Sequence, residues 1–220
     1  MIPKHIVTKL HTTTTRDYLA RVNNTDKATA AEKAMQWGYD YWDGSRDTGY
    51  GGYRYDGRWA PIAEELISTY NLTNGSKILD VGCGKGFLLH ELKTINAEFD
   101  VHGLDISSYA IDNSMETIKH AIKRGSAPKL PWEADYFDLV ISINTLHNLA
   151  LPDLWKALKE INRVGKKDKY ICVESYRNER EKVNLLYWQL TCKSFLGVGD
   201  WDFVFKETEY EGDYEFIYFE

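Results

Sequence analysis

A buried strand that runs into a glycine-rich turn constrains this sequence more than any other feature. The run Lys77–Val81 is short and mostly apolar, and three glycines follow it at every second position, Gly82, Gly84 and Gly86. From Phe87 onward, apolar residues recur at helical spacing. Glycine is needed where a backbone passes close to a ligand, and a helix that starts just past the turn presents free N–H groups to that ligand. The stretch therefore predicts a nucleotide-type binding turn in a parallel α/β sheet.

The spacing of the glycines allows two interpretations of this turn. The dinucleotide fingerprint is G-x-G-x-x-G, but here Gly86 comes one residue early and Phe87 occupies the expected position. Asp80, two residues before the first glycine, extends the pattern to D-x-G-x-G-x-G. Asp105 ends the next predicted strand about 20 residues past the turn, where a dinucleotide-binding enzyme also uses an acid. Asp105 alone therefore cannot identify the cofactor, and the turn must do so.

The D-x-G-x-G-x-G pattern resembles motif I of the class I S-adenosylmethionine (SAM) dependent methyltransferases. Further motifs of that family follow in the same order and spacing, so the resemblance extends from roughly Lys77 to Val173. The sequence departs from the family at Ser126, where many relatives carry Asp. The stretches that carry the resemblance beyond the turn are Val101–Ser107, Gly125–Ala127, Leu130–Trp132 and Phe137–Ser142.

The resemblance implies an α/β, Rossmann-like fold with a seven-stranded, mostly parallel sheet, helices on both faces and an antiparallel last strand. The expected strand order is 3-2-1-4-5-7-6. We predict the last two strands at Trp201–Phe205 and Tyr214–Phe219, because apolar and polar residues alternate there and a turn around Gly212 joins them. Residues 1–60 are expected to form an N-terminal helical arm and lid, and residues 61–220 the SAM-binding methyltransferase domain.

Cofactor contacts are expected at the carboxyl ends of the strands, where ligands bind in such sheets. Asp105 offers the acceptor-rich group that ribose hydroxyls need. By resemblance, Asp80 organises the turn and reaches the amino acid part of SAM, Ile106 packs on the adenine, and Ser126 and Ala127 lie beside it. The full set of predicted cofactor-binding residues is Asp80, Gly82, Cys83, Gly84, Asp105, Ile106, Ser126, Ala127 and Asn144.

Residues 41–59 form the most unusual stretch of the chain. They include five glycines, six aromatic residues and three arginines without apolar periodicity. One interpretation is a surface loop whose aromatic side chains attach it to the domain. We favour a lid over a ligand, because aromatics supply rigid contact area, arginines bind carboxylate or phosphate, and glycines allow movement. The lid residues predicted to face the substrate are Tyr50, Tyr53, Arg54, Arg58 and Trp59.

Two titratable residues are candidates for catalysis. His147 follows the fourth predicted strand, and Glu174 ends the fifth, so both lie at the substrate side of the sheet. His147 could act as a base for an alcohol nucleophile, and Glu174 could orient a hydroxyl or amine of the acceptor. The alternatives are that His147 is a core or helix-start residue and that Glu174 pairs with Arg177.

Composition narrows the partners of this chain. It has 220 residues and a formal net charge of −6, and no dense basic face is evident, so nucleic-acid binding is not expected. The three cysteines lack C-x-x-C spacing, and no apolar run of about 18 residues occurs, which predicts a cytoplasmic protein that does not bind membranes. No His and carboxylate pairs have metal-ligand spacing, so we expect no metal. The sequence leaves open whether the chain forms a homodimer.

These features predict a SAM-dependent methyltransferase that acts on a small polar acceptor and releases S-adenosylhomocysteine. An O-methyl transfer to a sugar or nucleotide sugar is the first hypothesis. The alternatives are an N- or S-methyltransferase of a small metabolite, a SAM-binding module without turnover, and an oxidoreductase, against which the early Gly86 counts.

Overall fold

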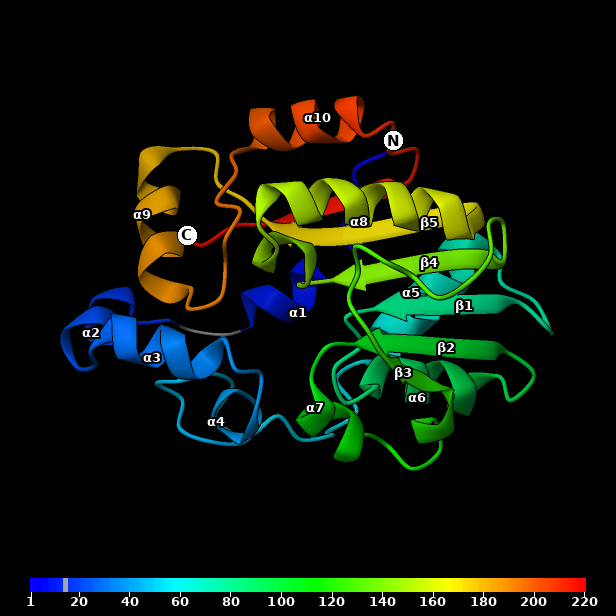
Figure 1. Ribbon diagram of the computed structural model, residues 1–220, viewed down its shortest axis with the longest axis horizontal. Helices are drawn as coiled ribbons and strands as arrows, with labels where there is room; N and C mark the ends of the chain where they lie inside the picture. The colour runs from blue at the N-terminus through cyan, green and yellow to red at the C-terminus, as the bar shows by residue number, and fades with distance from the viewer. Residues whose placement is uncertain (14–15) are drawn as a thin grey trace.

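The computed structural model describes residues 1–13 and 16–220 and has a central sheet flanked by helices (Figure 1). In that part of the chain the sheet has six strands in the order β3-β2-β1-β4-β5-β6, and every neighbouring pair is parallel. The expected α/β, Rossmann-like fold is thereby confirmed. The strands are β1 (Lys77–Val81), β2 (Asp100–Asp105), β3 (Ile122–Arg124), β4 (Phe137–Ile143), β5 (Gly165–Glu174) and β6 (Asp213–Ile217).

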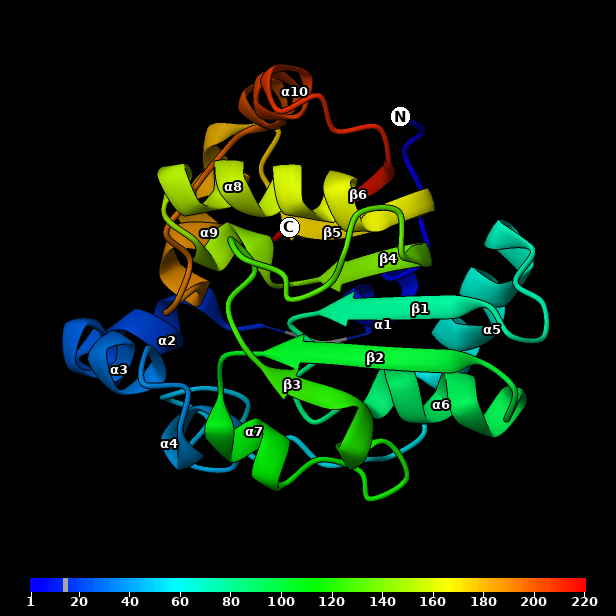
Figure 2. The ribbon, with the colours of Figure 1, turned by 45° about the vertical axis from the view of Figure 1, so that its right-hand side comes forward.

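Helices cover both faces of the sheet, because alternate residues of each buried strand point to opposite sides. Ile78 of β1 packs in one apolar cluster with residues of α5, α6 and α9, whereas its neighbour Leu79 packs in a second cluster with α8 and α10. Figure 2 shows α6 and α8 well apart, with the strands between them. The helices are α1 (Thr8–Thr12), α2 (Tyr18–Asn23), α3 (Lys27–Ala34), α4 (Tyr39–Trp42), α5 (Ala60–Tyr70), α6 (Phe87–Ile95), α7 (Ser108–Asp112), α8 (Leu151–Val164), α9 (Glu179–Trp188) and α10 (Val198–Glu207), with 3-10 turns η1 (Lys119–Ala121) and η2 (Leu146–Asn148).

The end of the chain differs from the sequence prediction in two respects. The segment predicted as a strand at Trp201–Phe205 lies within helix α10, so the described sheet has six strands rather than seven. The last strand is parallel to β5, not antiparallel, because α9 and α10 form a crossover connection rather than a hairpin. The alternating pattern was misleading: Trp201, Val204 and Phe205 also recur at helical spacing and are buried, whereas Phe203 is 61% exposed.

The N-terminal segment is attached to the edge of the sheet. Lys4 N donates to Tyr214 O at 2.8 Å and extends the pairing beyond β6. The buried Glu215 carboxylate then accepts hydrogen bonds from the backbone N–H groups of residues 6–8, where α1 begins, and from the Tyr170 hydroxyl at 2.6 Å. An acid at a helix start satisfies N–H groups that lack partners within the helix. This carboxylate therefore fixes the direction in which the arm leaves the sheet.

Candidate functional site

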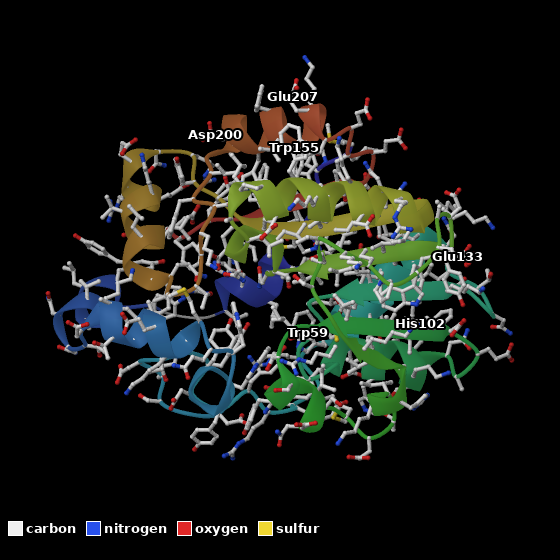
Figure 3. The ribbon with its side chains drawn as sticks, viewed as in Figure 1. Trp59, His102, Glu133, Trp155, Asp200 and Glu207 are labelled. Carbon is white, nitrogen blue, oxygen red and sulfur yellow. The ribbon has the colours of Figure 1, made fainter. Side chains whose placement is uncertain are left out.

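A cavity of about 290 Å³ lies beyond the carboxyl ends of the strands. In Figure 1 the strand arrows point toward α2, α3 and α4, and the segment 41–59 crosses between these helices and α5. Figure 3 shows Trp59 at this end of the sheet and His102 and Glu133 toward the other end. The volume is near the lower end of the range for small-molecule sites, about 300–1,000 Å³.

The glycine turn forms one wall of this cavity and has no room for side chains. Gly82 and Gly84 have φ angles of +85° and +55°, a region that favours glycine. A Cβ on Gly82 would lie 2.1 Å from Thr145 Oγ1, and a Cβ on Gly84 would lie 2.8 Å from the Trp42 ring. Cys83, between them, also lines the cavity. The turn therefore presents backbone to whatever fills the cavity.

Two buried carboxylates face the cavity from neighbouring strands. Asp105 accepts hydrogen bonds from Gly84 N at 2.7 Å and Ser107 N at 2.8 Å, which orients the carboxylate and leaves lone pairs for a ligand. Burial raises the pKa of Asp105. Burial, together with the nearby Asp105, raises the pKa of Asp80 to about 7. A ligand with hydroxyl groups and a positive charge would match this pair.

The other predicted cofactor residues also line this cavity. Ile106 is 52% exposed and offers an apolar surface beside it, while Ser126 and Ala127 lie on the loop after β3. Asn144, just after β4, has a φ of +54°, and its buried Oδ1 has no hydrogen-bond partner among the described residues. A buried oxygen without a protein partner, on a residue that lines a cavity, is suited to accept a hydrogen bond from a ligand. The glycine cradle, Asp105 and Asn144 together fit the SAM group that the family resemblance implies.

Residues 41–59 cover the cavity and are held against the glycine turn. Lys85, buried within the turn, donates to both Asp43 carboxylate oxygens at 2.8 and 2.7 Å and to Tyr53 O at 2.8 Å. Trp42 lies on the turn and donates from Nε1 to Ser107 Oγ at 3.0 Å. The segment is therefore attached to the two loops that contact the cofactor in the predicted arrangement.

The predicted lid residues divide into two groups in the structure. Tyr50, Tyr53 and Trp59 line the cavity, and Tyr53 stacks on Phe87 with ring centroids 4.9 Å apart. The two predicted arginines do not line it. Arg58 lines a neighbouring cavity but forms an ion pair with Asp56.

The remaining predicted lid residue, Arg54, is exposed and lines neither cavity.

The neighbouring cavity has a volume of about 200 Å³ and contains both predicted catalytic residues. It shares Tyr41, Tyr50, Asn144 and Asn148 with the first cavity, so the two are adjacent. A ligand in one would therefore meet a ligand in the other at this common wall.

Within the second cavity, Glu174 and His147 form a buried pair. Glu174 N donates to His147 Nδ1 at 3.3 Å, so the imidazole carries its proton on Nε2, which lies 3.4 Å from Glu174 Oε2. Burial lowers the pKa of His147 to about 3 and raises the pKa of Glu174 to about 8. Gln189 donates to Glu174 Oε1, whereas Oε2 has no hydrogen-bond partner among the described residues. Oε2 is thus available to accept a proton from a ligand.

Several residues of the two cavities were not predicted from the sequence. Trp42 and Tyr41 belong to the stretch that was singled out, but their roles depend on how that stretch folds. Arg16, Arg21 and Trp188 come from the arm and from the end of α9, and they meet only in the folded protein. Among the described residues, no group of three His, Cys, Asp or Glu side chains could hold a metal ion. In the same part of the chain, no helix has the length and apolar character needed to cross a bilayer.

The fold, the glycine turn and the acid at the end of β2 define a class I SAM-dependent methyltransferase. A family described as a methyltransferase domain matches residues 72–208, and the chain belongs to this family. This membership favours methyl transfer over the oxidoreductase alternative.

Known proteins resemble this chain over part of its length. It is 35% identical over 118 residues to a demethylmenaquinone methyltransferase of Staphylococcus haemolyticus, covering 51% of this chain and 48% of that protein. It is 32% identical over 130 residues to a tRNA (carboxymethyluridine(34)-5-O)-methyltransferase of Arabidopsis thaliana, covering 59% and 30%. The crystal structure of the YcgJ protein of Bacillus subtilis has a TM-score of 0.54 at 20% identity, with 66% of each chain covered. The chain thus spans about half or less of the length of these two curated relatives.

Proposed function

We propose that this protein transfers a methyl group from SAM to a hydroxyl group of a small polar acceptor, with a sugar-type hydroxyl as the first class. One observation carries the proposal. The cavity with the family's cofactor residues shares a wall with a second cavity that contains a buried carboxylate of raised pKa. That pKa, about 8, is suited to a general base near neutral pH.

In the first cavity, Asp105 would hold the ribose hydroxyls, the backbone of Gly82 and Gly84 would lie against the ligand, and Asp80 would face the amino acid part. SAM supplies a methyl group on a sulfonium, which is a good leaving group when attacked in line. Asn144 and the tyrosines of the common wall would align the two ligands, and alignment of this kind supplies much of the rate in such displacements.

In the second cavity, Glu174 would accept the acceptor's hydroxyl proton on Oε2 as the oxygen–carbon bond forms and the carbon–sulfur bond breaks. The electron pair of the broken bond stays on sulfur, which leaves neutral S-adenosylhomocysteine, and the proton ends on the carboxylate. His147 would pack beside the same carboxylate, with Nε2 3.4 Å from Oε2 and no hydrogen bond between them, and limit its movement. It is a positioning residue here, because its low pKa makes it a poor proton acceptor at neutral pH.

The need for a base favours a hydroxyl acceptor over an amine or thiol. A neutral amine or a thiolate attacks a sulfonium without help, whereas an alcohol requires removal of its proton. The N- and S-methyl alternatives and the non-catalytic module therefore need no proton acceptor, and they give no role to the unpartnered Glu174 Oε2.

The test is transfer of labelled methyl from SAM to a panel of sugars, sugar phosphates and nucleotide sugars, with Glu174→Gln as the variant. We expect one acceptor class to be methylated, and the variant to lose about 100- to 10,000-fold in kcat, as for other general bases. Its affinity for S-adenosylhomocysteine should stay the same.

Glu133→Gln is the matched control, because Glu133 is exposed and lies toward the far end of the sheet (Figure 3). Full activity of the Glu174→Gln protein would contradict the assigned base. Binding of SAM without turnover on any acceptor would favour the non-catalytic module.

A further inference from the structure

Three arginine side chains surround one tryptophan in the second cavity. The guanidinium carbons of Arg16, Arg21 and Arg46 lie 5.4, 4.9 and 5.5 Å from the centre of the Trp188 ring. All three side chains line the cavity that contains Glu174. Arg16 lies in the arm, Arg21 in α2 and Arg46 in the lid segment. Three separate parts of the chain thus place positive charge in the second cavity.

The hydrogen bonds of Arg21 and Arg46 fix the positions of these two side chains without neutralising them. Arg21 donates to the backbone carbonyls of Trp188 at 3.2 Å and Arg46 at 2.5 Å, and Arg46 donates to Tyr50 O at 2.8 Å. In the described part of the chain, neither Arg21 nor Arg46 forms an ion pair with a carboxylate within 4 Å. Asp47 is the acid that acts on Arg21 from a greater distance.

The charges in this cavity are therefore unbalanced. Arg58 is neutralised by Asp56, the charge of Arg16 acts on Glu174, and Asp47 acts on Arg21 only from a distance, so neither Arg21 nor Arg46 has a carboxylate in ion-pair contact among the described residues. Burial lowers the pKa of both Arg16 and Arg21, and the like charge of Arg46 adds to this effect. Two guanidinium groups facing one cavity match a dianion, and their forked donors fit the oxygens of a phosphate.

We propose that the second cavity binds a phosphate monoester group of the methyl acceptor, with Arg21 and Arg46 as the phosphate-binding residues beside Trp188. The identification of the ligand as the methyl acceptor rests on the proposed function, whereas the anion site itself does not. Glu174 then faces a hydroxyl of the same molecule. The cavity is about 200 Å³, smaller than the 290 Å³ next to it, so a phosphorylated sugar of one ring fits better than a nucleotide sugar.

The first experiment measures binding of inorganic phosphate to the full chain saturated with S-adenosylhomocysteine, by calorimetry and by phosphorus NMR line broadening. We expect phosphate to bind at least tenfold more tightly than acetate. Arg21→Gln and Arg46→Gln should each weaken phosphate at least tenfold. Arg46→Lys, which keeps the charge but loses the fork, should fall between the wild type and Arg46→Gln.

The matched control is Arg180→Gln, because Arg180 is an exposed arginine on α9, the helix that ends with Trp188. Equal phosphate affinity in the control and in both cavity variants would overturn the anion site. Acetate that binds as tightly as phosphate would replace the phosphate with a carboxylate and overturn the proposal in that form.

A second experiment separates the acceptor from free phosphate. Glucose 1-phosphate, glucose 6-phosphate and mannose 6-phosphate are tested as competitors against inorganic phosphate, each beside its unphosphorylated sugar. Displacement by at least one phosphate ester and by no parent sugar supports the acceptor assignment. Displacement by none of them leaves an anion site only and overturns it. If the wild-type protein does not bind S-adenosylhomocysteine, the proposed function is contradicted. Phosphate is then titrated into the protein alone, so the anion site is tested independently of the cofactor.

Discussion

Replacing Asp105 with alanine tests the cofactor site without knowledge of the acceptor. The carboxylate is buried and is oriented by Gly84 N and Ser107 N, so its remaining lone pairs point into the cavity. Leaving polar ligand groups unpaired costs about 1–3 kcal/mol. At about 1.4 kcal/mol for each tenfold change in Kd, Asp105→Ala should weaken S-adenosylhomocysteine binding by about 5- to 150-fold.

The same substitution removes the acceptor of two backbone donors, so it must be separated from a loss of folding. Each buried N–H left without a partner costs about 1–3 kcal/mol, which predicts a lower melting temperature as well as weaker binding. Calorimetric titration is therefore done below the transition seen by circular dichroism. Asp112→Ala is the control, because Asp112 is an exposed acid at the end of α7. A folded Asp105→Ala protein with wild-type affinity would refute the ribose assignment.

Three further predictions follow from buried charges. Because the pKa of Asp80 is raised to about 7, the carboxyl is mainly protonated in the free protein below that pH, and binding of the ligand's ammonium group favours the charged form. S-Adenosylhomocysteine should bind more tightly as pH rises from 5 to 8 with release of a proton, detected by titration in buffers of different ionisation enthalpy, and Asp80→Asn should abolish the dependence. The raised pKa also means that the contribution of Asp80 to stability is present below about pH 4 and is lost as pH rises through about 7, so Asp80→Asn should flatten the stability profile in that window. Glu215→Gln should lower the free energy of unfolding, measured by urea denaturation, by about 1.5–3 kcal/mol. Glu211→Gln, a control at an exposed acid, should leave it unchanged. Lys85→Met should release the lid residues Asp43 and Tyr53 from the glycine turn and increase trypsin cleavage within residues 44–58. An unchanged cleavage pattern would show that the lid is held elsewhere.

The cofactor side of the site was predictable because its determinants are local in the sequence. A strand, a turn that only glycine can form and an acid at the end of the next strand are all read from spacing, and the structure places them around one cavity. The last part of the sheet was predicted wrongly because the apolar residues of Trp201–Phe205 fit both the alternation of a strand and the spacing of a helix. Burial decides between these periods, and burial depends on the packing of α10 against α8 and the sheet, which no short stretch encodes.

The acceptor side of the site was predictable only in part. Glu174 ends β5 and His147 follows β4, so the sequence could place both at the carboxyl edge of the sheet, while their roles stay a prediction. Arg16, Arg21 and Trp188 gave no signal, since the two arginines precede Trp188 by more than 160 residues and meet it through the path of the arm. That path depends on the Glu215 carboxylate at the start of α1, a contact between opposite ends of the chain.

The division between these two sides also decides what can be transferred from relatives. The family match covers residues 72–208 and so includes the glycine turn, Asp105 and Glu174, but Arg16, Arg21 and Arg46 all precede it. The chemistry of methyl transfer therefore comes with the family, whereas the residues proposed to select the acceptor lie outside the matched region. A match over this region alone includes Glu174 and Trp188 but none of the three arginines, so the substrate of such a relative does not identify the acceptor of this chain. Substitutions of Arg21 and Arg46, which line only the second cavity, should change the acceptor and leave the binding of S-adenosylhomocysteine unaltered.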